Sequence, residues 1–211
     1  MIAYQADNQI EEEHLLNFVV NSLNEDLPID LADGVRVSAE ELYEVLAGAS
    51  ASVTSINHIC ETTEDSPHAN TVRGHLTDQF DLDTVEQVGD TLLQQDTIDT
   101  LPDRPVEVVA DLHLDPYYGD EDETEALYSS LAKRGTTTFH AYATLYARVR
   151  NKRYTLAVRQ LVAGETSSDV LSEFFELLDG LDLGVKAVYL DRGFYNSTCL
   201  GLLYAYNYAY V

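Results

Sequence analysis

Basic residues are scarce in this chain, and their scarcity restricts its surface. Only 12 of the 211 residues are Lys or Arg, against 37 Asp and Glu, which gives a net charge of −25. A surface of this charge stays soluble through self-repulsion, as in proteins that work in multimolar salt. Long apolar periodic segments argue against a disordered acidic chain. We therefore expect a folded protein from a halophilic cytoplasm.

Cysteines and long apolar runs are also rare. Cys60 and Cys199 are too few for a disulfide framework, and they form no Cys-x-x-Cys pair that would indicate zinc. The first residues, Met-Ile-Ala-Tyr-Gln-Ala-Asp, contain neither the basic nor the apolar region of a signal peptide, and no run of about 18 apolar residues occurs. We expect a soluble, cytoplasmic protein without a membrane partner.

Acidic residues are absent from one window of the chain. The 39 residues between Glu125 and Glu165 contain no Asp or Glu, yet they hold seven of the 12 Lys and Arg residues. The window therefore either faces a polyanion or packs against the protein's own acidic surface. The seven basic residues are Lys133, Arg134, Arg148, Arg150, Lys152, Arg153 and Arg159.

Residues 1–104 are predicted to form a helical domain. Apolar residues recur there near the helical period, and Ser38 and Glu41 have the spacing of a capping box, in which each side chain accepts the other's backbone amide. Ser66 and Pro67 predict an N-cap and a first-turn proline for a helix of residues 68–78.

Short helices with tight turns in this domain are compatible with a DNA-binding helix-turn-helix. The second helix would then present Arg73 to DNA, beside His68, Asn70 and His75. A helical bundle without DNA contacts explains the same pattern. The 22 acids and three arginines of residues 1–105 disfavour an approach to phosphates. Both interpretations remain open.

The pattern changes from helices to strands after residue 105. Polar and apolar residues alternate in residues 106–115, 137–149 and 154–161, which predicts three strands. A helix near residues 167–181, a strand of residues 185–190, a helix of residues 196–206 and a strand of residues 208–211 follow. The predicted order in residues 105–211 is strand, strand, strand, helix, strand, helix, strand, in an α+β or α/β fold with a mixed sheet.

Two aspartates close apolar runs that are 80 residues apart in the chain. Asp111 ends Val106-Glu-Val-Val-Ala-Asp, and Asp191 ends Val185-Lys-Ala-Val-Tyr-Leu-Asp. If the first three strands form an antiparallel meander, a helical crossover brings the fourth strand parallel to the first and beside it. The two aspartates would then lie side by side, where open sheets place ligands. Paired carboxylates can share divalent ions for attack on a phosphodiester, and oxygen ligands favour Mg²⁺ or Mn²⁺.

Three basic residues are the predicted phosphate contacts of this site. Lys133 and Arg134 enter the second strand from the carboxylate end, and Arg192 directly follows Asp191. Arg192 has an alternative partner, because an ion pair with Asp111 or Asp115 would use the same side chain.

Three segments carry a family resemblance: Asp111-Leu-His-Leu-Asp-Pro-Tyr-Tyr-Gly119, Lys133-Arg-Gly-Thr-Thr-Thr-Phe-His-Ala-Tyr142 and Tyr189-Leu-Asp-Arg-Gly-Phe-Tyr195. They resemble the DDE transposases of prokaryotic insertion sequences, closest to those of halophilic archaea. The resemblance implies a ribonuclease-H-like catalytic domain in residues 105–211 and cut-and-paste DNA transposition, a DNA recombination reaction. It also implies two bound Mg²⁺ (or Mn²⁺), with Asp111 and Asp191 as catalytic and metal-binding residues.

The family's third acid, a glutamate, lies on a helix beyond the last predicted strand, and Val211 precedes that position. We therefore expect an incomplete, inactive transposase copy whose partners are the DNA of the terminal repeats and either a second copy or a full-length transposase. The main alternative is a non-catalytic DNA-binding or regulatory protein of transposition. A third hypothesis is a self-sufficient nuclease with Asp115 or Asp120 as the third ligand.

Overall fold

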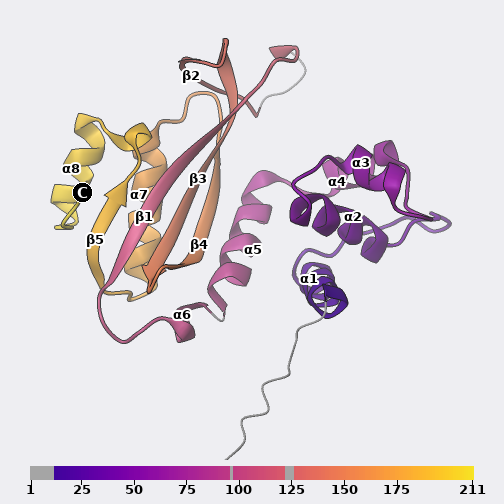
Figure 1. Cartoon of the computed structure of the whole chain (residues 1–211), viewed down its shortest axis with the longest axis horizontal. Coiled ribbons are helices and arrows are strands. Elements are labelled where there is room, and N and C mark those ends of the chain that lie inside the picture. The colour runs from indigo at the N-terminus through magenta and orange to yellow at the C-terminus, as the bar shows by residue number, and fades with distance from the viewer. Residues whose placement is uncertain (1–11, 96, 122–125) are drawn as a thin grey trace, which may run out of the picture. The chain divides into compact units, whose positions relative to one another are not determined.

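Helices occupy the first half of the chain, and strands begin only at Val106 (Figure 1). The computed structural model describes residues 12–95, 97–121 and 126–211. They belong to two units, Met1–Val88 and Gly89–Val211, and the chain passes from one to the other within α5 (Leu82–Gln95). The fold is therefore mixed, with helices and a sheet, as the sequence predicts. Among the described residues, none of the helices combines the length and apolar character that a membrane span requires.

The first unit is a small helical assembly around Leu42, Tyr43 and Val72. The Tyr43 hydroxyl donates to the carbonyl of Leu27, and burial raises the pKa of Tyr43 to about 12. Its helices are α1 (Glu12–Asp26), α2 (Ala39–Ala51), α3 (Ile56–Thr62) and α4 (Ala69–Gln79).

Of two helix starts predicted from the sequence in this unit, the structure confirms one and corrects the other. The Ser38 hydroxyl accepts the amide of Glu41 at 3.2 Å, and the Glu41 carboxylate accepts the amide of Ser38 at 2.7 Å, which confirms the capping box. The predicted N-cap at Ser66 is wrong. His68 caps α4 instead, because its Nδ1 accepts the amide of Asn70 at 3.2 Å and the helix begins after it.

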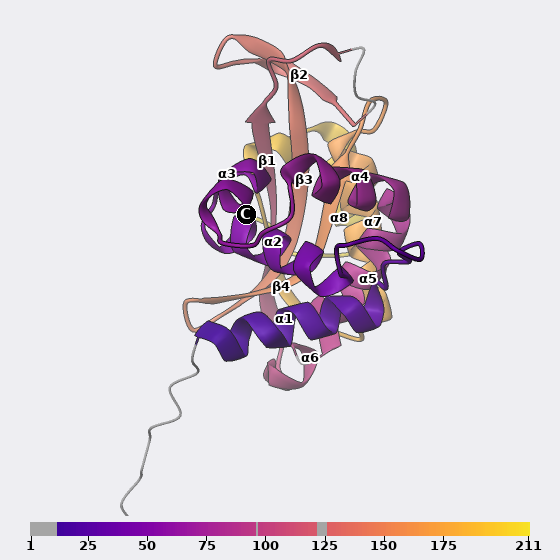
Figure 2. The ribbon, with the colours of Figure 1, turned by 90° about the vertical axis from the view of Figure 1, so that its right-hand side faces the viewer.

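The second unit is built on a five-stranded sheet with the order β2-β3-β1-β5 (Figures 1 and 2). Strand β4 also pairs with β3, along residues 141–149, whereas β2 pairs with residues 136–139 of the same strand. β3 is antiparallel to both β1 and β4, whereas β5 is parallel to β1, as the meander and crossover predict. Val188 also bridges Tyr210 in parallel, so the last residues extend the sheet beside β5. The strands are β1 (Val106–Pro116), β2 (Tyr128–Lys133), β3 (Thr136–Val149), β4 (Lys152–Leu161) and β5 (Val185–Leu190).

Helices α7 (Ser167–Gly180) and α8 (Ser197–Ala205) cover one face of this sheet (Figure 1). Phe174 and Phe175 of α7 and Leu203 of α8 are fully buried there. Two shorter elements complete the unit, α6 (Thr97–Thr100) and the 3₁₀ helix η2 (Arg192–Phe194).

The two faces of β1 differ in burial, and this difference positions the candidate site. Val106, Val108 and Ala110 are buried toward the helices, whereas Asp111 and Asp115 alternate with them and are exposed. Because side chains alternate between the faces of a strand, the acids of β1 lie on the face away from the buried core.

Candidate functional site

Asp111 and Asp191 occupy neighbouring positions on two parallel strands. Ala110 of β1 is in register with Leu190, the last residue of β5, and an aspartate follows each of them. The backbone amide of Asp191 donates to the carbonyl of Ala110 at 3.1 Å, which fixes this arrangement. Neighbouring strands are about 4.8 Å apart, so the two aspartates are close neighbours across the sheet. This is the juxtaposition that the sequence predicts, and both residues are exposed to solvent.

The turn after Asp191 is held tightly against β1. The amide of Phe194 donates to the carbonyl of Asp191 at 3.0 Å, and the Phe194 ring is fully buried. A Cβ atom on Gly193 would lie 2.5 Å from Cδ2 and 3.1 Å from Cβ of Leu112. The sequence Asp-Arg-Gly-Phe therefore has a packing reason: glycine lets the turn approach β1, and phenylalanine anchors it.

The face around the aspartates is lined by hydroxyl and aromatic side chains. Thr144 of β3 lies opposite Asp111 in the register, and Tyr142 lies opposite His113 two residues further along. Burial and, to a smaller extent, the charge of Asp115 raise the pKa of Tyr142. The surface can thus accept and donate hydrogen bonds to a polar ligand beside the two carboxylates.

A divalent metal ion fits this donor set only in part. Two adjacent carboxylates supply the oxygen ligands that Mg²⁺ and Mn²⁺ prefer. Residues 12–95, 97–121 and 126–211 contain no group of three His, Cys, Asp or Glu side chains that could hold a metal ion. Asp115 is four residues from Asp111 along β1, about 14 Å at the usual rise, and Asp120 lies beyond the end of that strand. Neither therefore neighbours the aspartate pair along the sheet.

The predicted phosphate contacts are not gathered around the aspartates. Lys133 pairs with Thr136 at the β2–β3 turn, whereas Asp111 pairs with Thr144. These positions are eight residues apart along β3, which is about 27 Å. Arg134 follows Lys133 in the turn and, like it, belongs to the distant end of the sheet, because β1 and β3 continue past the point where β5 ends.

Of the three predicted phosphate contacts, only Arg192 lies close to the aspartates. It directly follows Asp191 and is the exposed first residue of η2. No acid of the described residues lies within ion-pair distance of Arg192, so the alternative pairing with Asp111 or Asp115 is not formed. A ligand phosphate at the aspartates would therefore find this guanidinium without an intramolecular partner among those residues.

Arg73, the predicted DNA contact of the helical unit, links two helices. Its Nη2 donates to Asn57 of α3 at 3.0 Å, and its Nη1 donates to Asn70 of α4 at 3.2 Å. The side chain is exposed, so a phosphate could share it, but part of its hydrogen-bonding capacity is used within the unit.

The basic residues of the acid-free window lie in different surroundings. Arg159 forms a two-pronged contact with Asp90 of α5, at 2.9 and 2.6 Å, and lies 3.3 Å from Glu173 of α7. Its side chain is only 14% exposed. Arg159 therefore packs against the protein's own acids, whereas Arg148, Arg150, Lys152 and Arg153 lie at or beside the β3–β4 turn. The sequence alone could not divide the window in this way.

No protein-family model, curated protein or solved structure matches this chain. Its function has to be inferred from the residues and their geometry.

Proposed function

We propose that this chain takes part in DNA transposition as a DDE transposase of the haloarchaeal type, and that residues 105–211 belong to its ribonuclease-H-like catalytic domain. The observation that carries the proposal is the adjacency of Asp111 and Asp191 on the parallel strands β1 and β5. The sheet order supports it as well: an antiparallel meander is followed by parallel strands on the other side of β1, with the acid pair where β5 ends.

The proposed chemistry is metal-dependent phosphoryl transfer on DNA. Asp111 and Asp191 would hold Mg²⁺ or Mn²⁺, which supplies charge stabilisation and a nucleophile of lowered pKa to such reactions. Arg192 would bind a phosphate oxygen beside them and orient the strand. The described residues bring two carboxylates together, fewer than a two-metal site requires, so we propose that these residues alone do not cleave DNA strands.

Titration with Mn²⁺, followed by electron paramagnetic resonance, tests the proposed metal site. We expect Asp111→Asn and Asp191→Asn each to weaken Mn²⁺ binding by about tenfold or more, a loss typical of a disrupted metal site. Asp99→Asn is the matched control, because Asp99 is an exposed aspartate of α6. Equal affinity in all four proteins would refute the proposal. A loss caused by Asp115→Asn would instead favour the nuclease hypothesis.

A non-catalytic DNA-binding or regulatory protein of transposition is the second candidate. It is favoured by the two-carboxylate donor set, since the described residues assemble no three-acid metal group. On this hypothesis, binding to terminal-repeat DNA survives Asp111→Asn but weakens with Arg73→Ala. Arg36→Ala is the charge-matched control in the same unit, because Arg36 is exposed. An unchanged affinity of the Arg73→Ala variant would count against it.

A further inference from the structure

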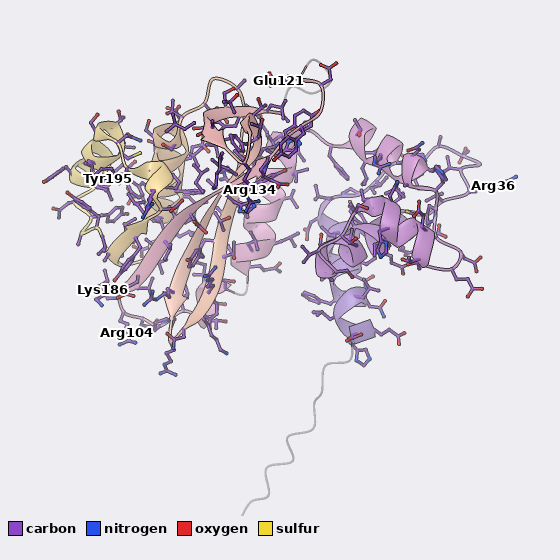
Figure 3. The ribbon with its side chains drawn as sticks, turned by 45° about the horizontal axis from the view of Figure 1, so that its top comes forward. Arg36, Arg104, Glu121, Arg134, Lys186 and Tyr195 are labelled. Atoms are coloured by element: carbon purple, nitrogen blue, oxygen red, sulfur yellow. The ribbon has the colours of Figure 1, made fainter. Side chains whose placement is uncertain are left out.

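Six of the 12 basic residues gather at the end of the sheet where β1 and β5 begin and the β3–β4 hairpin turns. They come from the segment before β1, from the hairpin and from β5. Figure 3 shows Arg104 and Lys186 near this end of the sheet and Arg134 away from it. The six residues, named here the basic end, are Arg104, Arg148, Arg150, Lys152, Arg153 and Lys186.

Two hollows open between these side chains. The larger, of about 410 Å³, is lined by Arg104, Arg150 and Lys152 together with Pro102 and Tyr154. The second, of about 290 Å³, shares Arg104 and Arg150 and adds Arg148 and Lys186. Glu107 is the one acid in the two linings, all of whose residues the structure describes. The basic end is therefore a concave, positively charged surface on a strongly acidic protein.

The internal acids leave most of this charge uncompensated. Glu107 accepts from Lys186 at 2.9 Å and lies 3.7 Å from Arg148, and the Lys186 contact holds the pKa of Glu107 below its usual value. Within the part of the chain that the structure describes, no acid pairs with Arg104, Arg150 or Lys152. In a chain with 37 acids, such a cluster indicates an external anion.

Two features of the β3–β4 hairpin that carries these cations are locally unfavourable. Arg148 and Arg153 are directly opposite across β3 and β4, and like charges in that position destabilise a strand pair. Arg150 has φ 49° and Asn151 has φ 66°, the backbone of a two-residue turn that favours glycine, asparagine or aspartate at both positions. An arginine at the first position is less favourable there than glycine, since its Cβ atom disfavours a left-handed backbone.

Aromatic rings position two of the guanidinium groups. The Arg153 guanidinium lies over the Tyr146 ring, 5.0 Å from its centroid, and that of Arg148 lies over Tyr189 at 5.8 Å. Such contacts hold a cation at a surface without neutralising it. Two of the six charges of the basic end, those of Arg148 and Arg153, are thus positioned by aromatic rings.

We propose that the basic end binds the phosphate backbone of duplex DNA. Its cations extend over β4, β3, β1 and β5, three strand spacings or about 14 Å, which is more than one phosphate can cover but is matched by successive phosphates of a nucleic acid strand. Glu107, at the centre of the cluster, precedes Asp111 by four residues, or about 14 Å along β1. The identification of the polyanion as DNA rests on the proposed function. The anion site itself rests on the geometry alone.

Fluorescence anisotropy of a labelled duplex of unrelated sequence, with the full chain and no divalent metal, tests this proposal. The titration is repeated over a series of KCl concentrations at which circular dichroism shows a folded protein. Lys152→Glu should weaken binding by about tenfold and lower the salt dependence by about one phosphate contact. Arg36→Glu is the matched control, because it changes the net charge by the same amount in the other unit and should leave affinity nearly unchanged.

Arg150→Gly separates binding from folding. It removes a cation and relieves the left-handed strain, so it should weaken DNA binding while raising the unfolding temperature. Equal effects of Lys152→Glu and Arg36→Glu, or the absence of binding to the duplex, would overturn the proposal. The titration contains no divalent metal, so a failed metal site would leave the difference between Lys152→Glu and Arg36→Glu intact, whereas a failed basic end would abolish it.

Discussion

At the residue scale, the placement of Asp191 depends on its neighbours more than on its own contacts. Its amide is bound to Ala110, its carbonyl accepts from Phe194, and Gly193 lets the turn lie against Leu112. The carboxylate therefore projects from a backbone that is fixed on both sides. The backbone of Asp191 is thus fixed beside β1, whereas no hydrogen bond of the described residues holds its side chain.

Gly193→Ala should disturb this turn. The added methyl group would approach Leu112 too closely, so we expect the free energy of unfolding to fall by about 1–3 kcal/mol, as for overpacking of a core. Urea unfolding followed by circular dichroism measures the change. Gly201→Ala is the matched control in α8, where a Cβ meets no atom within 4 Å, and it should raise stability slightly. An unchanged free energy of unfolding in Gly193→Ala would show that the turn is not packed tightly against Leu112.

At the element scale, α7 begins with a reciprocal cap. Thr166 and Asp169 bond each other's backbone amides, at 3.4 and 2.9 Å, and the Thr166 hydroxyl donates to the Asp169 carboxylate at 2.7 Å. Phe174 and Phe175 of this helix lie in the core of the sheet unit. The cap therefore fixes the start of the helix that covers the face of the sheet opposite the aspartates.

Thr166→Ala should lower the free energy of unfolding by about 1 kcal/mol, the usual cost of losing an N-cap. Thr198→Ala, at an exposed position within α8, is the control and should be nearly neutral. Chemical denaturation at neutral pH measures both. An equal effect of the two substitutions would contradict a special role of the cap.

The same cap predicts a pH dependence. Hydrogen bonds from Thr166 lower the pKa of Asp169 below its ordinary value of 3.8, so the folded state favours the charged carboxylate. Its contribution is fully present above that ordinary value and is lost as the pH falls through the lower, folded value. The stability difference between the parent and Thr166→Ala should therefore narrow below about pH 4. A difference that stays constant on acidification would be inconsistent with this linkage.

Element order was predictable from the sequence because each strand and helix has its own periodic pattern. The pairing of β5 with β1 followed from a meander and one crossover, so the adjacency of Asp111 and Asp191 could be predicted. Strand β2 could not be predicted, because its residues, Tyr-Ser-Ser-Leu-Ala-Lys, are mostly exposed and it pairs only with the edge of β3. The distance from Lys133 to the aspartates could not be predicted either, because it depends on how far β1 and β3 extend beyond β5.

At the scale of the whole molecule, charge is distributed unevenly. The net charge is −25, yet half of the basic residues lie at one end of one sheet. Self-repulsion of the acidic surface destabilises the folded state at low ionic strength, and salt screens it.

Salt should therefore stabilise this protein. We expect the unfolding temperature to rise steadily as KCl is increased from about 0.1 M to multimolar concentrations, since screening reduces repulsion among the acids. Thermal unfolding followed by circular dichroism measures it. An unfolding temperature independent of KCl would contradict the expectation that the acidic surface is adapted to high salt.

If Asp111 and Asp191 hold one cation between them, as proposed above, metal-directed cleavage of the backbone will reveal it. Fe²⁺ can replace Mg²⁺ at an oxygen site, and with ascorbate and peroxide it cuts the backbone close to where it binds. We expect two cuts, near residues 111 and 191, and the loss of both cuts when either aspartate is replaced by asparagine. Cleavage at other positions only, or a cut near residue 111 that persists in Asp191→Asn, would contradict it.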